Sequence, residues 1–109
     1  MKDYPKRIKA QLRKLMGEAY ERELARELAQ LATKFAEWQA GRIDASELNE
    51  LIHKHHNGPS REMFNYYNNV SPSTSVARAV VEGLFAEDDI PADVWPYIED
   101  MVKIYRSYL

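Results

Sequence analysis

The amino-acid sequence predicts an all-α fold, a single-domain bundle of four to five helices that spans residues 1–109. Apolar residues recur at steps of three and four, and proline or a capping residue stands where each such stretch begins. No segment shows the strict alternation of a β-strand. With 45% hydrophobic and 29% charged residues, the chain has the composition of a folded domain.

The first predicted helix is unusually long and covers residues 5–40. Asp3 or Tyr4 can cap it, and Pro5 suits its first position because the N–H that proline lacks has no partner there. At ~1.5 Å per residue such a helix is on the order of 50 Å long, and Gly17 is the expected place for a bend. Its apolar stripe consists of Ile8, Leu12, Leu15, Met16, Tyr20, Leu24, Leu28, Leu31, Phe35 and Trp38. A row of alanines lies one residue after the leucines and would let another helix approach closely: Ala25, Ala29, Ala32 and Ala36.

The second predicted helix covers residues 45–57 and folds back on the first as a helical hairpin. Gly41 can take the left-handed conformation that ends helices, and Asp44 with Glu47 resembles a capping box. Ile43 and Leu48 stand at the positions of a hydrophobic staple. The sequence Asn57-Gly58-Pro59 is expected to stop this helix, because proline cannot continue the hydrogen-bond ladder.

Three further helices and a one-turn helix are expected in the second half of the chain. Ser60 can cap a short helix to residue 68, with Met63, Phe64 and Tyr67 pointing inward. Pro72 begins a wide-faced, buried helix expected to reach residue 85, in which Gly83 would permit a close crossing. Pro91 and Pro96 mark a one-turn helix and then a final helix to about residue 108. Its expected core residues are Val94, Ile98, Met101, Val102 and Tyr105.

Composition narrows the function classes. The chain has no cysteine, which excludes disulfides, thiolate nucleophiles and zinc sites that need sulfur. No stretch approaches the ~18 apolar residues of a membrane span, so we expect a cytoplasmic protein without membrane contact. No glycine-rich phosphate loop or nucleophile elbow is present, and we expect no cofactor, no resident metal and no catalytic residue.

The most site-like feature is the polar cluster at residues 53–62. His53 and His56 are three residues apart on one helical face, and Arg61 follows Pro59. They could hold a metal or an anion in a small enzyme, although the spacing matches no zinc motif. We favour the interpretation that these histidines are solvated or satisfy the last carbonyl groups of the helix.

Basic residues form a second candidate site. Lys2, Lys6, Lys9 and Arg13 recur at steps of four, three and four along the first helix, a geometry that could follow a nucleic-acid backbone. The C-terminal part of the chain is acidic, however, and we favour attraction between the two ends within one fold or across a dimer.

The sequence therefore predicts a non-enzymatic, helical protein–protein interaction or regulatory module that forms a homodimer or binds another protein. The length of the first helix favours this function, because the rest of the chain is short for covering it. The expected interface residues are Leu24, Leu28, Leu31, Phe35 and Trp38. A nucleic-acid-binding protein is the alternative, and an enzyme acting through residues 53–62 is the second alternative.

Overall fold

The structure is a computed structural model that describes residues 4–109, and it is all-α, as the sequence predicts. A π-helical turn joins α2 to α3, two 3-10 turns precede α5, and no strand occurs in the described residues. The elements are α1 (Lys6–Gln39), α2 (Ala45–His55), η1 (His56–Ser60), α3 (Arg61–Asn69), α4 (Pro72–Val81), η2 (Glu87–Asp89), η3 (Trp95–Tyr97) and α5 (Glu99–Ser107).

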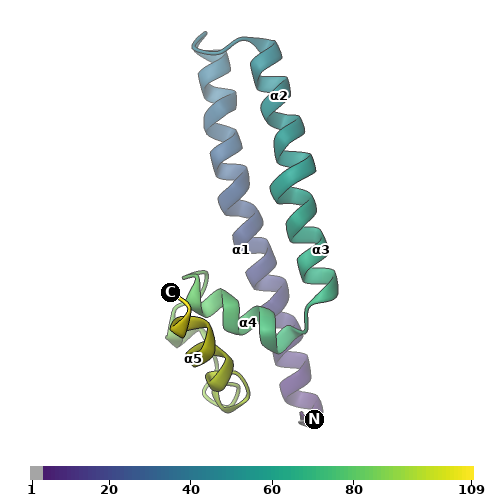
Figure 1. Cartoon of the computed structure of the whole chain (residues 1–109), viewed down its shortest axis with the longest axis vertical. Coiled ribbons are helices and arrows are strands. Elements are labelled where there is room, and N and C mark those ends of the chain that lie inside the picture. Colours follow the sequence, from purple (N-terminus) through teal and green to yellow (C-terminus); the bar gives the residue numbers. More distant parts are fainter. Residues whose placement is uncertain (1–3) are drawn as a thin grey trace.

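The long helix α1 and the rod formed by α2, η1 and α3 run antiparallel as a hairpin. Helix α4 packs against its lower half, and α5 packs against α4 (Figure 1). The molecule measures 54 × 26 × 24 Å, and its radius of gyration is 17.3 Å. A compact domain of this length would have a radius of gyration of about 13 Å. The difference arises because the upper half of the hairpin is only two helices thick.

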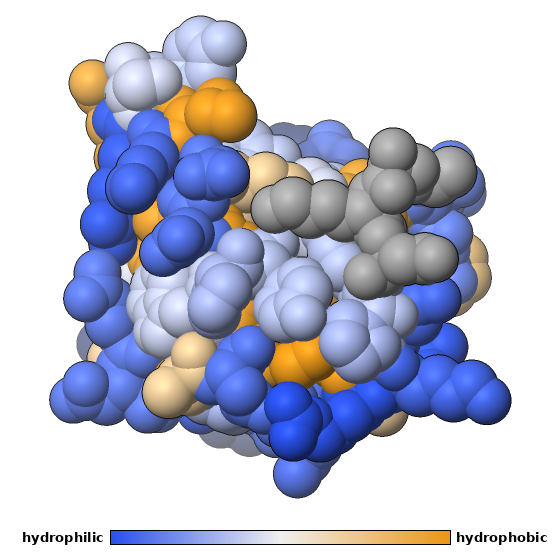
Figure 2. Space-filling view, turned by 90° about the horizontal axis from the view of Figure 1, so that it is seen from below, coloured by the Kyte–Doolittle hydropathy of each residue, from blue (hydrophilic) through white to orange (hydrophobic). Residues whose placement is uncertain are grey.

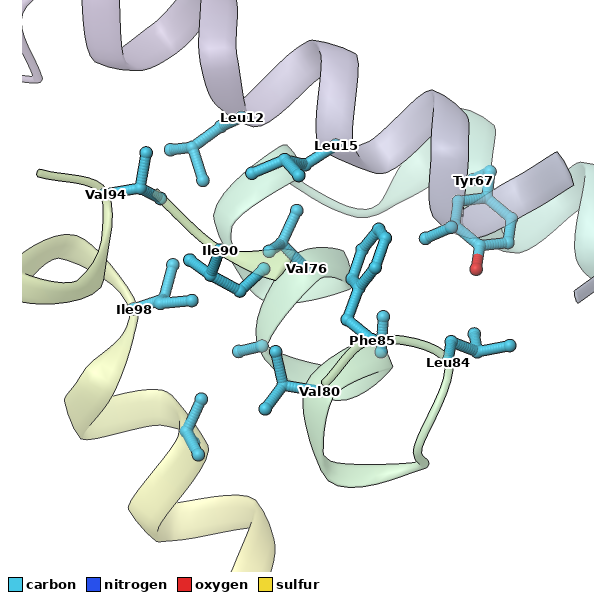
Figure 3. Close-up of a cluster of buried hydrophobic side chains, with 14 of the residues drawn as sticks. Leu12, Leu15, Tyr67, Val76, Val80, Leu84, Phe85, Ile90, Val94 and Ile98 are labelled. Carbon is cyan, nitrogen blue, oxygen red and sulfur yellow. The ribbon is translucent and has the colours of Figure 1, made fainter. Parts of the chain in front are cut away.

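The hydrophobic core lies where α4 and α5 meet the first half of α1 (Figure 3). Leu12 and Leu15 of α1 point toward Val76 of α4 and Val94 of the loop before α5 (Figure 3). Helix α4 is the most buried element, as expected, because six of its ten residues are buried. The remaining buried core residues on α1 and in the C-terminal segment are Ile8, Ala19, Leu84, Phe85, Ile90, Ile98 and Val102.

The turn between α1 and α2 confirms the local sequence signals. Gly41 has a φ of 76°, its N–H donates to the carbonyl of Trp38, and the N–H of Arg42 donates to the carbonyl of Glu37. This pair of bonds is a Schellman motif, which satisfies two carbonyl groups at the end of α1. Asp44 then caps α2 by accepting a 2.8 Å hydrogen bond from the backbone N–H of Glu47.

The expected helix break at Asn57-Gly58-Pro59 is wrong. The chain continues from α2 into α3 through the π-helical turn η1, and Gly58 keeps a negative φ. A π turn is wider than an α turn, so the proline ring does not collide with the carbonyl four residues earlier. As a result, α2 and α3 form one rod along α1 rather than two separately directed helices.

The expected end of α4 at residue 85 is also wrong. The helix ends at Val81, and Gly83 lies outside it with a φ of 79°. The N–H of Gly83 donates to Val80 and the N–H of Leu84 donates to Ala79, which makes a second Schellman motif. Gly83 therefore terminates the helix rather than permitting a close helix crossing.

The start of α1, the bend at Gly17 and the inward position of Phe64 are the remaining local expectations. Asp3 lies outside the described residues, and Pro5 is the N-cap of α1 rather than its first residue. The helix runs through Gly17 without interruption. Phe64 was expected to point inward, but it is 58% exposed because it lies ~100° around α3 from the buried Met63.

Candidate interaction surface

The two halves of α1 differ in what covers them. In the first half, Ile8, Leu12, Leu15 and Ala19 are buried under α4 and α5, whereas no residue of α1 after Ala19 is fully buried. We call residues 24–39 of α1 together with α2 the distal arm. In Figure 1 the arm is the upper part of the hairpin, where only α1 and α2 lie side by side.

One side of α1 in the arm faces α2 and η1. Glu27, Leu31 and Lys34 of α1 line a shallow pocket of about 220 Å³ together with Leu51 and Pro59. Leu31 is half-buried there, and Leu24 is half-buried against the core cluster. Two of the five interface residues expected from the sequence are therefore partly covered by the rest of the chain.

Next to the side of α1 that faces α2, the arm has an apolar row without a covering element in the described chain. We call Ala25, Leu28, Ala32 and Phe35 the outer seam. They follow one another at steps of three, four and three, so they lie on one side of the helix. All four are exposed, with Leu28 at 46% and Phe35 at 40%. Ala29 and Ala36, also exposed, widen the seam on one flank.

No charged residue interrupts the seam. Arg26 and Glu27 point away from the seam, because each residue of an α-helix is turned by ~100° from the residue before it. Lys34 also lies off the seam, and its ammonium group is 3.3 Å from the carboxylate of Glu37. Trp38, the last expected interface residue, is 41% exposed near the end of α1. Contiguous apolar side chains of this kind on a protein surface mark sites of interaction.

A half-buried ion pair fixes the base of the arm. The guanidinium Nη2 of Arg78 on α4 lies 2.8 and 2.9 Å from the two carboxylate oxygens of Glu23 on α1. The same guanidinium lies over the ring of Tyr66 on α3, 3.8 Å from its centroid. Burial raises the pKa of both Tyr66 and Tyr67 above the ordinary tyrosine value. Arg78 thus holds α1, α3 and α4 together where the arm leaves the core, and nothing in the sequence pattern indicates this long-range pair.

A second cation–aromatic contact supports the same junction. The guanidinium of Arg22 lies 4.7 Å from the centre of the Phe85 ring and donates to the carbonyl oxygen of Leu84 at 2.9 Å. It also contacts the carboxylate of Asp89 at 3.3 Å. The hydrogen bond from the Ala86 N–H and the contact with Arg22 hold the pKa of Asp89 below its ordinary value. The loop after α4 is therefore tied to α1 just below the arm.

The polar cluster at residues 53–62 lies on the rod formed by α2, η1 and α3. His53, His56 and Arg61 are exposed, and His55 is half-buried against the pocket between α1 and α2. In residues 4–109 no group of three or more histidine, aspartate or glutamate side chains is placed to hold a metal ion. Binding of an anion by His53, His56 and Arg61 stays a prediction.

The basic stripe lies at the other end of α1. Lys6, Lys9 and Arg13 are exposed on α1, and Lys2 lies outside the described residues. Their neighbour Arg7 forms an ion pair with Asp93 at 3.2 Å, which joins the basic end of the chain to its acidic C-terminal part. Viewed from this end, the surface is mostly hydrophilic, with small apolar areas between the polar side chains (Figure 2). Nucleic-acid binding by the stripe stays a prediction.

Comparison with models of protein families, with curated proteins and with solved structures finds no significant match for this chain. Within residues 4–109, no helix combines the length and apolar character that a membrane crossing requires.

Proposed function

We propose that this chain is a non-enzymatic helical interaction module that binds a protein through the outer seam of its distal arm. The observation that carries the proposal is the exposure of Leu28 and Phe35 within a charge-free side of α1. Depletion of charge at the centre and enrichment in aromatic residues are typical of protein–protein interfaces. The exposed Trp38 beside the seam has the same character.

The arm presents this surface in an ordered form. The Schellman motif at Gly41, the Asp44 cap and the continuous rod through η1 define the path of both helices of the arm. The Glu23–Arg78 ion pair attaches the arm to the core at its base. A surface that is ordered before binding loses little conformational entropy when a partner docks, which favours affinity.

The test is capture of proteins by the tagged full-length chain from the lysate of its native host, followed by mass spectrometry. Leu28→Asp and Phe35→Asp place a charge in the seam, and we expect each to abolish capture of the specific partner. Phe64→Asp is the matched control, because Phe64 is an exposed aromatic residue on α3 outside the arm. Circular dichroism establishes that all three variants fold.

Capture that is unchanged by Leu28→Asp and Phe35→Asp would overturn the proposed binding surface. A chain that captures no protein and does not associate with itself would overturn the interaction function. Binding to DNA or RNA that falls with salt and requires Lys6 and Lys9 would favour the nucleic-acid alternative instead.

A further inference from the structure

We propose that the occupant of the outer seam is a second copy of this chain, whose α1 packs antiparallel against the first with the twofold axis at the height of Gln30. This inference rests on the proposed function and specifies its partner. The spacing of Ala25, Leu28, Ala32 and Phe35 is the repeat of a helix–helix seam, in which apolar residues alternate at steps of three and four.

The sizes of the seam residues select the antiparallel arrangement. Small and large side chains alternate along the seam, in the order Ala25, Leu28, Ala32 and Phe35. An antiparallel second copy centred at Gln30 brings Phe35 opposite Ala25 and Leu28 opposite Ala32. Each layer then combines one large and one small side chain, so the helices can keep a constant distance and fill the space between them.

A parallel arrangement in register lacks this complementarity. Phe35 would face Phe35 of the second copy, and Ala32 would face Ala32. Layers that are too wide would then alternate with layers that leave cavities, and both overpacking and cavities are unfavourable.

The polar residues at the ends of the seam fit the same register. Glu21 of one copy lies opposite Gln39 of the other, and both residues are exposed in the described chain. The twofold axis repeats this contact, so a carboxylate–amide contact closes each end of the apolar seam. Such polar contacts act mainly on register and orientation.

The shape of the molecule accommodates the second copy. The core residues of α1 end at Ala19; α4 packs on that lower half, and α5 packs against α4 (Figure 1). The antiparallel overlap begins near Glu21 and extends to Gln39, so the two cores lie at opposite ends of the dimer. Each arm then packs against the other arm, away from its own α4 and α5.

The expected dimer is weak. The overlapping helix face is ~30 Å long and ~10 Å wide, which corresponds to an interface at or below the low end of the specific size range. Association should therefore depend on concentration. Sedimentation equilibrium of the full chain, at protein concentrations from about 1 µM to about 1 mM, detects a dimer whose dissociation constant lies in that range.

A size exchange tests the layer pairing. Ala32→Leu places leucine opposite leucine, and we expect the dimer dissociation constant to rise at least about tenfold. The double variant L28A/A32L exchanges the large and small positions within the pair and should restore association. Ala10→Leu is the matched control, since Ala10 is an exposed alanine of α1 outside the overlap.

A single introduced cysteine tests the direction. The chain has no cysteine of its own, so a spin label at Gln39→Cys reports one distance between copies. The antiparallel dimer separates the two labelled positions by ~27 Å along the helix, from nine rises of ~1.5 Å on either side of Gln30. A parallel dimer brings the labels side by side.

The outcomes separate the two proposals. A strict monomer at about 1 mM that still binds a protein through Leu28 overturns the dimer and leaves the interaction function standing. A dimer with adjacent Gln39→Cys labels, or one unaffected by Ala32→Leu, overturns the antiparallel seam. A strict monomer that also captures no protein overturns both.

Discussion

Replacing Arg78 with methionine should destabilise the fold by about 2–3 kcal/mol. The substitution keeps the aliphatic packing of the side chain but removes both hydrogen bonds to Glu23 and the contact with Tyr66. A hydrogen bond to a charged group contributes ~1.5–3 kcal/mol, and removal of one partner leaves the other charge partly buried. The two side chains are 22% and 20% exposed, so the loss should be smaller than the ~3–5 kcal/mol seen for fully buried pairs.

The assay is urea unfolding followed by circular dichroism, with the free energy of unfolding extrapolated to water. The double-mutant cycle of Glu23→Gln and Arg78→Met isolates the coupling between the two residues, which we expect to exceed about 1 kcal/mol. Lys34→Met is the control, because the Lys34–Glu37 pair is more exposed, at 44% and 27%, and should contribute less than about 0.5 kcal/mol. A loss below about 0.5 kcal/mol for Arg78→Met, or strictly additive single variants, would refute this reasoning.

Two further predictions concern the backbone and the helix cap. Gly17→Ala, inside α1 with open space around it, should stabilise the fold by about 0.5–1 kcal/mol, whereas Gly41→Ala should destabilise it by about 1 kcal/mol because Gly41 has a φ of 76°. If urea unfolding gives the same change in the free energy of unfolding for both variants, the helical role of Gly17 and the left-handed role of Gly41 are contradicted. Hydrogen bonds from the Glu47 N–H and from Ser46 lower the pKa of Asp44, so its stabilisation is present above its ordinary pKa and is lost as the pH falls through the lowered value. The loss of unfolding free energy caused by Asp44→Ala should therefore become smaller as the pH falls from about 7 to about 3. Asp44→Asn removes the titrating group and keeps a side chain that can cap the helix. A penalty that does not change with pH would argue against the cap as the cause.

Much of the fold could be predicted because its signals are local. Gly41 and Asp44 act through hydrogen bonds to residues within a few positions, and Pro72 occupies the first turn of α4. The periodicity of α1 likewise depends only on neighbouring residues and extends over its whole length. Such signals are readable without knowledge of the tertiary fold.

The features that sequence reasoning missed depend on contacts between distant segments or on rare backbone geometry. Glu23 and Arg78 are 55 positions apart, and no periodicity links them. Proline after Gly58 is usually a helix breaker, and the π turn that accommodates it is an uncommon alternative. The sequence indicated five interface residues together, but only the arrangement of α2 separates half-buried Leu24 and Leu31 from exposed Leu28, Phe35 and Trp38.

The π turn η1 also sets the rotational phase of the rod. In an uninterrupted α-helix, the apolar residues of α2 around Leu48 and those of α3 around Met63 and Tyr67 would point in directions tens of degrees apart. A π turn advances by less than the ~100° per residue of an α-helix, so five residues of it turn the α3 stripe back toward that of α2. Both stripes can then face the same straight α1. The segment His56–Ser60 thus acts as an angular spacer, and changes in its length would alter the fit of α2 and α3 at once.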